Sequence, residues 1–257
     1  MARLAGVLFV CLAFCASGTL AAPRLTARPN AEAAGTLPVG ISKLADGAFV
    51  YSPTLDSNAR PGVIVLFHGA GGDARRFIDL FRAEADRRQM LLLSVQSTGR
   101  TWDIVLDNSR DAWPGGRVRS VQAGGGDARH VNAALSALFR RTAIDPGRII
   151  AAGFSDGASY ALSLGLPNGH LFTGIVALAP GFVTETEIRE QLPIAIAHGQ
   201  SDQILSYARA QAMASDLRNR GYPVQFFPFA GDHMVDPGSL SKALDFVLSP
   251  MKGDKHL

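Results

Sequence analysis

The sequence predicts an α/β fold in which a mainly parallel central sheet is covered by helices on both faces. Three observations lead to this prediction. Short apolar runs of the kind found in buried parallel strands alternate with helical segments along the chain. Histidines and a serine follow several of these runs directly, beside glycines. The 257 residues, 47% of them hydrophobic, suffice for one sizeable core.

The first half of the folded part predicts three strands and one helix. We expect strands over residues 48–51, 62–67 and 90–95, with a helix over residues 74–88. The run from Gly62 to Phe67 is apolar throughout and precedes a glycine-rich turn, as expected for a buried parallel strand. A long polar loop over residues 99–126 follows, and loops of that length are usually functional or mobile.

The second half continues the alternation. We expect strands over residues 148–154, 172–178, 193–197 and 224–229, and helices over residues 128–141, 156–166, 206–220 and 239–248. In a sheet of this kind the ligand site lies at the carboxyl ends of the strands. The residues that directly follow each strand are therefore the candidates for the ligand site.

The amino terminus has the layout of a signal peptide. Arg3 precedes an apolar run over residues 4–14, and small residues follow as far as Ala22. Cleavage after Ala21 or Ala22 would remove residues 1–22, including both cysteines, and would lower the net charge from +3 to +2. We expect a secreted or periplasmic protein without disulfides; an uncleaved anchor, or a lipoprotein anchored at Cys15, remains the alternative.

Three further segments complete the predicted organisation. Residues 23–37 contain two prolines and no sustained apolar period, which predicts a flexible lead-in. Residues 38–250 form the single folded domain, and residues 251–257 form a polar tail. The modest charge and ordinary composition exclude a nucleic-acid binder and a disordered or fibrous chain.

A candidate nucleophile lies in the pentapeptide Gly153-Phe-Ser155-Asp-Gly157. This G-x-S-x-G pattern stands between a predicted strand and a predicted helix, the setting in which it marks a nucleophilic serine. The glycines allow a sharp turn that exposes the hydroxyl, while the helix amino end faces developing negative charge.

A serine hydroxyl needs a base, and we assign this role to His233 among the six histidines. It lies in a loop after the last predicted strand, from which it can reach Ser155. We expect His68 to shape its own loop and His198 to support the turn that follows it; the others are His130, His170 and His256.

The carboxylate that orients the base is predicted to be Asp202, which lies just past the strand over residues 193–197. The resulting chain order of serine, aspartate and histidine is typical of one group of serine hydrolases. Asp232 and Asp236 remain rivals. Asp232 is very close to His233 in sequence, and Asp236 is placed to start the final helix.

The oxyanion hole is expected to consist of the backbone amides of Ala70 and Asp156. The glycine-rich loop over residues 68–73 can approach the serine closely, and the Asp156 side chain is expected only to cap its helix. Trp102 and Trp113 either line a substrate pocket or anchor their loop by packing.

A rival interpretation comes from residues 69–74, which match a dinucleotide-binding pattern with a terminal alanine. That reading requires an acidic residue after the next strand, where the sequence has Gln96-Ser97-Thr98. No metal-ligand spacing and no phosphate-loop motif occurs either. We therefore expect no metal and no cofactor.

Taken together, the motifs around His68, Ser155, Asp202 and His233 resemble the α/β-hydrolase superfamily, most closely its phospholipase/carboxylesterase group. Residues 143–150 are also similar to secreted polyhydroxybutyrate depolymerase-like and feruloyl esterase-like proteins. The resemblance spans residues 39–248. It departs from the family at Asp156 and at Ala158, where the second glycine of such turns is missing.

The resemblance implies an α/β-hydrolase fold without a large lid domain. It also implies a serine esterase, with Ser155 as nucleophile, His233 as base and Asp202 as its partner. We expect a small-molecule or polymeric ester as substrate, with short or accessible acyl groups. Three alternatives stay open: a polyester depolymerase or feruloyl-type esterase, an amidase or peptidase, and a binding module that has lost catalysis.

Overall fold

An eight-stranded sheet lies at the centre of the structure, a computed structural model that describes residues 24–33, 35–44, 47–56, 60–105, 117–118, 125–184 and 190–250. The strand order is β1-β2-β4-β3-β6-β7-β9-β10. These strands are β1 (Gly40–Lys43), β2 (Phe49–Ser52), β3 (Gly62–Phe67), β4 (Met90–Val95), β6 (Ile149–Phe154), β7 (Gly174–Leu178), β9 (Ile194–Gly199) and β10 (Val224–Phe229). Strand β2 runs antiparallel to both neighbours, and the six strands from β4 to β10 in this order run parallel.

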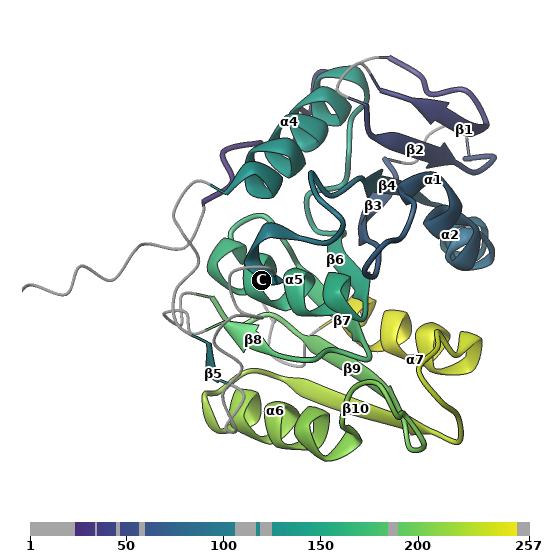
Figure 1. The fold of residues 1–257 in the computed structure, drawn as a ribbon. Helices are drawn as coiled ribbons and strands as arrows, with labels where there is room; N and C mark the ends of the chain where they lie inside the picture. The colour runs from purple at the N-terminus through teal and green to yellow at the C-terminus, as the bar shows by residue number, and fades with distance from the viewer. Residues whose placement is uncertain are drawn as a thin grey trace, which may run out of the picture.

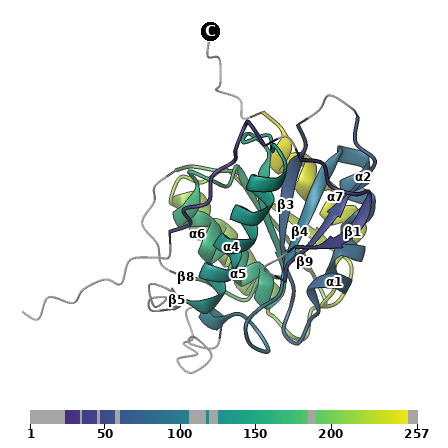
Figure 2. The same cartoon turned by 90° about the horizontal axis from the view of Figure 1, so that it is seen from above.

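Helices cover both faces of the sheet (Figures 1 and 2). One face packs against α1 (Ala74–Phe77), α2 (Arg82–Arg88) and α7 (Pro237–Leu248). The other packs against α4 (Gly126–Arg141), α5 (Asp156–Gly165) and α6 (Tyr207–Asn219). The short strands β5 (Arg117–Val118) and β8 (Val183–Thr184) pair outside the main sheet. The predicted fold class is confirmed, and the described residues contain no separate lid domain.

Strand β3 shows why its sequence is apolar at every position. Val63, Val65 and Phe67 pack into the core beneath α4 and α5. The residues between them, Ile64 and Leu66, pack into the opposite core beneath α1, α2 and α7. Since successive strand residues face opposite sides, a strand covered by helices on both faces needs apolar residues throughout.

The short strands β5 and β8 were not predicted, and the sequence-based elements also differ from the structure at two places in the first half of the domain. The helix expected over residues 74–88 is divided into α1, a 3₁₀ turn η1 (Ile78–Leu80) and α2, because the apolar spacing does not distinguish a 3₁₀ turn from an α-helix. Strand β1 was not predicted. Its four residues are at most partly buried at the edge of the sheet, so they carry no buried apolar pattern.

The lead-in expected to be flexible is instead packed on the domain from residue 24 to residue 28. Leu25 is buried, and its amide donates a hydrogen bond to Asn168 Oδ1 at 2.8 Å. The amide of Ala27 donates to Asn132 Oδ1 at 2.9 Å. These residues thus pack against the domain where the sequence predicts a flexible lead-in. Only Leu25 and Ala27 are buried, and two alternating apolar residues are too short a pattern to predict such packing.

Two expectations about the ends of the chain fall outside this description. Residues 1–22, expected to be a signal peptide, and residues 251–257, expected to be a polar tail, are not among the described residues. None of the helices within the described ranges has the length and apolar character needed to cross a membrane.

Candidate active site

Ser155 occupies a sharp turn between β6 and α5 (Figure 1). Its φ is 57° and its ψ is −121°, a conformation that residues other than glycine rarely adopt. The amide of Ser155 donates to the carbonyl of Leu178 in β7 at 2.8 Å, which helps to hold the turn. The turn fixes the nucleophile at the carboxyl end of the sheet.

Two glycines allow this turn to form. A Cβ on Gly153 would lie 2.1 Å from the carbonyl oxygen of Gly157. A Cβ on Gly157 would lie 2.0 Å from the carbonyl oxygen of Phe67. Because no side chain fits at either position, the G-x-S-x-G pattern is a packing requirement of the turn as well as a catalytic signature.

The structure brings Ser155, His233 and Asp202 together in the arrangement that the sequence predicts. His233 Nε2 lies 2.9 Å from Ser155 Oγ, and His233 Nδ1 lies 2.7 Å from Asp202 Oδ2. The histidine ring packs on the Phe154 ring with a centroid separation of 4.8 Å. The three side chains come from the carboxyl ends of β6, β10 and β9. This geometry allows proton transfer from the hydroxyl to the imidazole.

The carboxylate of Asp202 is fully buried, and both of its oxygens have hydrogen-bond partners. Its Oδ1 accepts hydrogen bonds from the amides of Ile204 and Leu205, each at 2.8 Å, and its Oδ2 faces His233. Burial by itself would raise the pKa of Asp202, but the hydrogen bonds from these amides and from His233 outweigh it and lower the pKa. Asp202 is therefore a carboxylate throughout the neutral range.

The lowered pKa of Asp202 implies that the free energy of unfolding depends on pH. An aspartate whose pKa is lower in the folded state stabilises the fold above its unfolded pKa of about 3.9, and this contribution is lost as the pH falls through the folded value. The difference in free energy of unfolding between the wild type and Asp202→Asn should therefore stay constant from neutral pH to about pH 5 and shrink below about pH 4. Urea unfolding at several pH values measures it, and a difference that grows in acid would contradict the assignment.

The rival acids have other functions. Asp232 Oδ1 accepts from the amides of His233 at 2.8 Å and Gln203 at 3.2 Å, and so joins the loop that carries the base to the loop that carries the acid. Asp236 caps α7 by accepting from the amide of Ser239 at 2.7 Å. Neither is the partner of the His233 ring.

The two histidines at strand ends support loops, as predicted. The amide of Ser97 donates to His68 Nε2 at 3.2 Å, so His68 Nδ1 carries the proton and donates to the carbonyl of Gly69 at 2.7 Å. His198 Nε2 lies 2.9 Å from the carbonyl oxygen of Leu205 and 3.1 Å from Asp202 Oδ2. It therefore donates at that nitrogen and fixes the turn around the acid.

One of the predicted oxyanion-hole donors directly follows the nucleophile, and the other lies on the loop after β3. Asp156 is the first residue of α5, where amides have no partner within the helix. The loop after β3 passes so close that a Cβ on Gly69, the residue before Ala70, would lie 3.4 Å from Ser155 Cβ. Within the described part of the chain, neither the Ala70 amide nor the Asp156 amide donates to a protein acceptor. Both remain available to an oxyanion.

Two side-chain predictions need correction. The Asp156 carboxylate does not cap α5, and instead accepts a hydrogen bond from Thr101 Oγ1 at 2.7 Å. Trp102 does not line a substrate pocket. It is fully buried, its Nε1 donates to the carbonyl of His68 at 2.8 Å, and its ring stacks on Tyr160 at 4.4 Å. A ring so enclosed anchors its segment. Trp113 lies outside the described residues.

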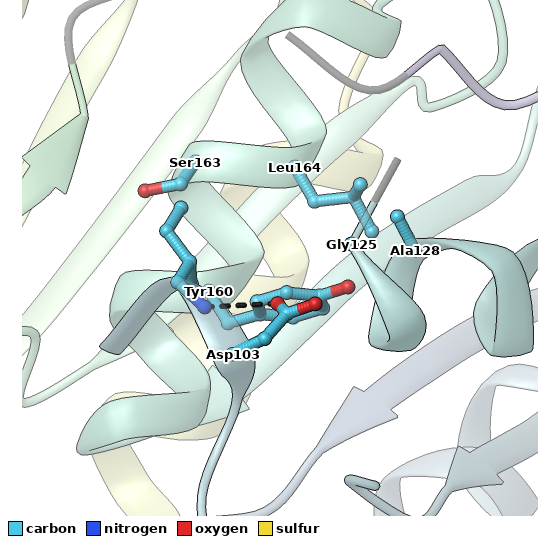
Figure 3. Close-up of a pocket in the computed structure, with 7 residues that line it drawn as sticks. Asp103, Gly125, Ala128, Tyr160, Ser163 and Leu164 are labelled. Carbon is cyan, nitrogen blue, oxygen red and sulfur yellow. Dashed lines mark hydrogen bonds between the residues drawn. The ribbon is translucent and has the colours of Figure 1, made fainter. Parts of the chain in front are cut away.

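A small cavity of about 10 Å³ lies where the segment that carries Asp103 meets the start of α4 and the helix α5 (Figure 3). It is lined by Asp103, Ile104, Gly125, Ala128, Tyr160, Ser163 and Leu164. Burial, followed by the nearby carboxylates of Asp103 and Asp127, raises the pKa of Tyr160, which therefore keeps its hydroxyl proton. A space of this size holds at most about one water molecule, so it is not a substrate site.

No three histidine, cysteine, aspartate or glutamate side chains among the described residues lie close enough together to hold a metal ion. The side chains joined to Ser155 by hydrogen bonds are His233 and, through it, Asp202. The contact between Thr101 and Asp156 was not predicted, because its only local signal is that an aspartate follows the nucleophile.

Comparison with known proteins gives a family match over most of the chain. Residues 46–249 match the profile of the phospholipase/carboxylesterase family. Among curated proteins, an acetylxylan esterase of Coprinopsis cinerea is 30% identical over 116 residues, which are 43% of this chain and 28% of that protein. An acyl-protein thioesterase 1 of Neurospora crassa is 29% identical over 124 residues, which are 44% of this chain and 51% of that protein. The matches thus span about half or less of these relatives.

Solved structures share the fold at low sequence identity. A carboxylesterase of Bacillus cereus superposes with a TM-score of 0.56 at 21% identity, covering 78% of this chain and 92% of that structure. A phospholipase/carboxylesterase of Dyadobacter fermentans superposes with a TM-score of 0.58 at 22% identity, covering 83% of this chain and all of that structure.

Proposed function

This chain belongs to the phospholipase/carboxylesterase family of α/β-hydrolases, a family of carboxylic ester hydrolases, and we propose that it cleaves carboxylic esters through an acyl-enzyme formed on Ser155. The observation that carries the proposal is the pair of contacts made by one imidazole. His233 Nε2 lies 2.9 Å from the Ser155 hydroxyl, and His233 Nδ1 lies 2.7 Å from the buried Asp202 carboxylate.

Acylation begins when Ser155 Oγ attacks the acyl carbon and its proton passes to His233 Nε2. Asp202 supports this step because its carboxylate accepts the Nδ1 proton, which leaves Nε2 free as the base. The amides of Ala70 and Asp156 stabilise the negative charge that develops on the carbonyl oxygen. The protonated His233 then donates its proton to the departing alcohol.

Deacylation repeats the same chemistry with water. His233 takes a proton from a water molecule, whose oxygen attacks the acyl carbon attached to Ser155 Oγ. The second tetrahedral intermediate collapses, the carboxylic acid leaves, and the proton returns from His233 to Ser155. Both half-reactions use the same two amides.

The substrates are short-chain or otherwise accessible esters. Support comes from the described part of the chain, which contains no separate lid domain. The curated relatives named for acetylxylan and for acyl-protein thioesters both act on acyl groups attached to larger molecules. Polyesters, feruloyl esters and amides remain the competing substrate classes for the same three side chains.

An ester series tests this substrate class. With p-nitrophenyl esters from acetate to palmitate, kcat/KM should be highest for the shortest acyl groups and should fall towards palmitate, because a long chain would lie exposed to water. The Ser155→Ala variant in the same series gives the background rate. A serine-dependent rate that increases up to palmitate would contradict the proposed preference and favour a long-chain lipase.

We also propose that the protein acts outside the cytoplasm, as a secreted or periplasmic enzyme without disulfides. The support is the signal-like sequence of residues 1–22, which holds both cysteines of the chain. The amino-terminal sequence of the protein recovered from the producing cells tests this directly: a start at Ala22 or Pro23 supports export, and a start at Met1 or Ala2 opposes it.

A further inference from the structure

One buried contact next to the nucleophile has no part in the mechanism above. Thr101 Oγ1 donates a hydrogen bond of 2.7 Å to Asp156 Oδ2, across 55 positions of sequence. Thr101 is only 7% exposed. Asp156 is the residue directly after Ser155, and its amide is one of the two proposed oxyanion donors. The contact therefore fixes the side chain of a residue whose backbone faces the reaction.

The two neighbours of Thr101 hold the other side of the oxyanion hole. The carbonyl of Arg100 accepts from the amide of Gly71 at 2.7 Å, and Trp102 Nε1 donates to the carbonyl of His68 at 2.8 Å. Gly71 directly follows Ala70, the residue that carries the second donor. Arg100, Thr101 and Trp102 thus each make one hydrogen bond to a segment that forms the oxyanion hole. Two of these bonds go to the loop after β3, and one goes to the turn that carries Ser155.

This tripeptide is itself held firmly. The Trp102 ring stacks on Tyr160 of α5 at a centroid distance of 4.4 Å and meets the Phe67 ring edge-on at 5.2 Å. Since Phe67 is the last residue of β3 and Tyr160 lies on α5, the anchor joins the two elements that carry the oxyanion donors. A rigid connection of this kind keeps the distance between two donors constant.

The spacing of the donors matters because an oxyanion is stabilised only by amides already in position. Asp156 also brings an acidic side chain to the residue that carries one donor amide, directly after Ser155. If the hydrogen bond from Thr101 were lost, this side chain would be free to turn towards the oxyanion and repel its charge. A hydroxyl that donates to a carboxylate makes a short, charge-assisted bond, which suits it to prevent this movement.

We propose that Thr101 is a positioning residue for the oxyanion hole and that it acts through Asp156. This inference rests on the proposed esterase activity. The hydroxyl holds the Asp156 carboxylate, fixes the adjoining amide and keeps the negative charge turned away from the developing oxyanion. Thr101 itself touches neither substrate nor reacting atoms.

The test is a double-mutant cycle on kcat for p-nitrophenyl acetate. Thr101→Val keeps the size of the side chain but removes the donor, and it should lower kcat about tenfold, a part of the 10²- to 10³-fold effect of deleting an oxyanion donor, with KM little changed. Affinity for a trifluoromethyl ketone, which forms the tetrahedral adduct, should fall in parallel. In an Asp156→Ala background, Thr101→Val should change kcat by no more than about twofold.

Controls separate positioning from general damage to the fold. Thr101→Ser retains the hydroxyl and should recover most of kcat. Thr98→Val removes an exposed hydroxyl from the same segment and should leave kcat unchanged. The pH dependence of kcat should be the same in wild type and Thr101→Val, because the triad is untouched. Urea unfolding of every variant shows whether it is folded.

Three results would overturn the proposal: a folded Thr101→Val enzyme with wild-type kcat, an equal loss in both backgrounds, or a loss that appears only in KM. If Thr101→Val does not fold, Asp156→Ala removes the same bond from the other side. Because alanine also removes the negative charge, this variant tests the fixing of the amide alone, and an unchanged kcat would overturn the proposal that the bond fixes it. A wild-type protein without esterase activity would instead refute the proposed function, so the two failures are distinguishable.

Discussion

Replacing Ser155 by alanine should lower kcat for ester hydrolysis by a factor of at least about 10⁴, while the protein remains folded. The effect is large because the hydroxyl is the atom that forms the covalent intermediate. In the alanine variant, the Asp202 and His233 side chains have no other side-chain nucleophile to activate at this position. Steady-state assays with p-nitrophenyl acetate measure kcat of the wild type and of the variant. The residual activity after loss of a triad member is small, so the difference between the two is large.

A second substitution at the same position, Ser155→Gly, provides a matched control for the stability of the turn. Ser155 has a φ of 57°, and alanine keeps the Cβ that makes this conformation unfavourable. Ser155→Gly removes it, so the glycine variant should be more stable than the alanine variant by about 1 kcal/mol, although both are inactive. Urea unfolding of the two variants provides the comparison. Equal stabilities would mean that the turn is not strained, and an active alanine variant would refute the nucleophile.

Asp202→Asn should be the second most damaging change, with a loss in kcat of about 10⁴-fold. The amides of Ile204 and Leu205 both donate to Oδ1, so an asparagine must place its oxygen there and its NH₂ group towards His233. That NH₂ group cannot accept the proton of His233 Nδ1. The imidazole is then driven to carry its proton on Nε2, where it cannot act as a base for Ser155.

The neighbouring carboxylate supplies the control for this change. Asp232→Asn keeps an oxygen that can accept from the amides of Gln203 and His233, so it should cost less than about tenfold in kcat. Both variants are assayed with the same ester, and their folding is checked by circular dichroism. A larger loss in Asp232→Asn than in Asp202→Asn would mean that the wrong acid has been assigned to the triad.

The fold could be predicted from the sequence because buried parallel strands leave a strong pattern. In β3 and β4 every residue is buried, and each run is apolar enough to be recognised without any other information. Strand β1 carries no such pattern at the edge of the sheet, and it was missed. The division of residues 74–88 into three short helical pieces was missed because both helix types place the same residues on the sheet.

The residues of the candidate site that lie in recognisable local motifs could be predicted from the sequence. Ser155, Asp202 and His233 each follow a recognisable strand, and chain order then limits their roles. The contact between Thr101 and Asp156, by contrast, depends on how a loop returns over the sheet, and no local pattern encodes that path. For the same reason the sequence could not decide whether Trp102 lines a pocket or anchors the loop, and burial decides for the anchor.

Labelling with a fluorophosphonate shows whether Ser155 is an activated nucleophile. The probe forms a covalent bond only with a serine whose proton is removed by a base. We expect one label per protein molecule, located by mass spectrometry on the peptide that contains Ser155, and no label on Ser155→Ala. A wild-type protein that stays unlabelled, or a label that persists in the alanine variant, would mean that Ser155 is not the activated nucleophile.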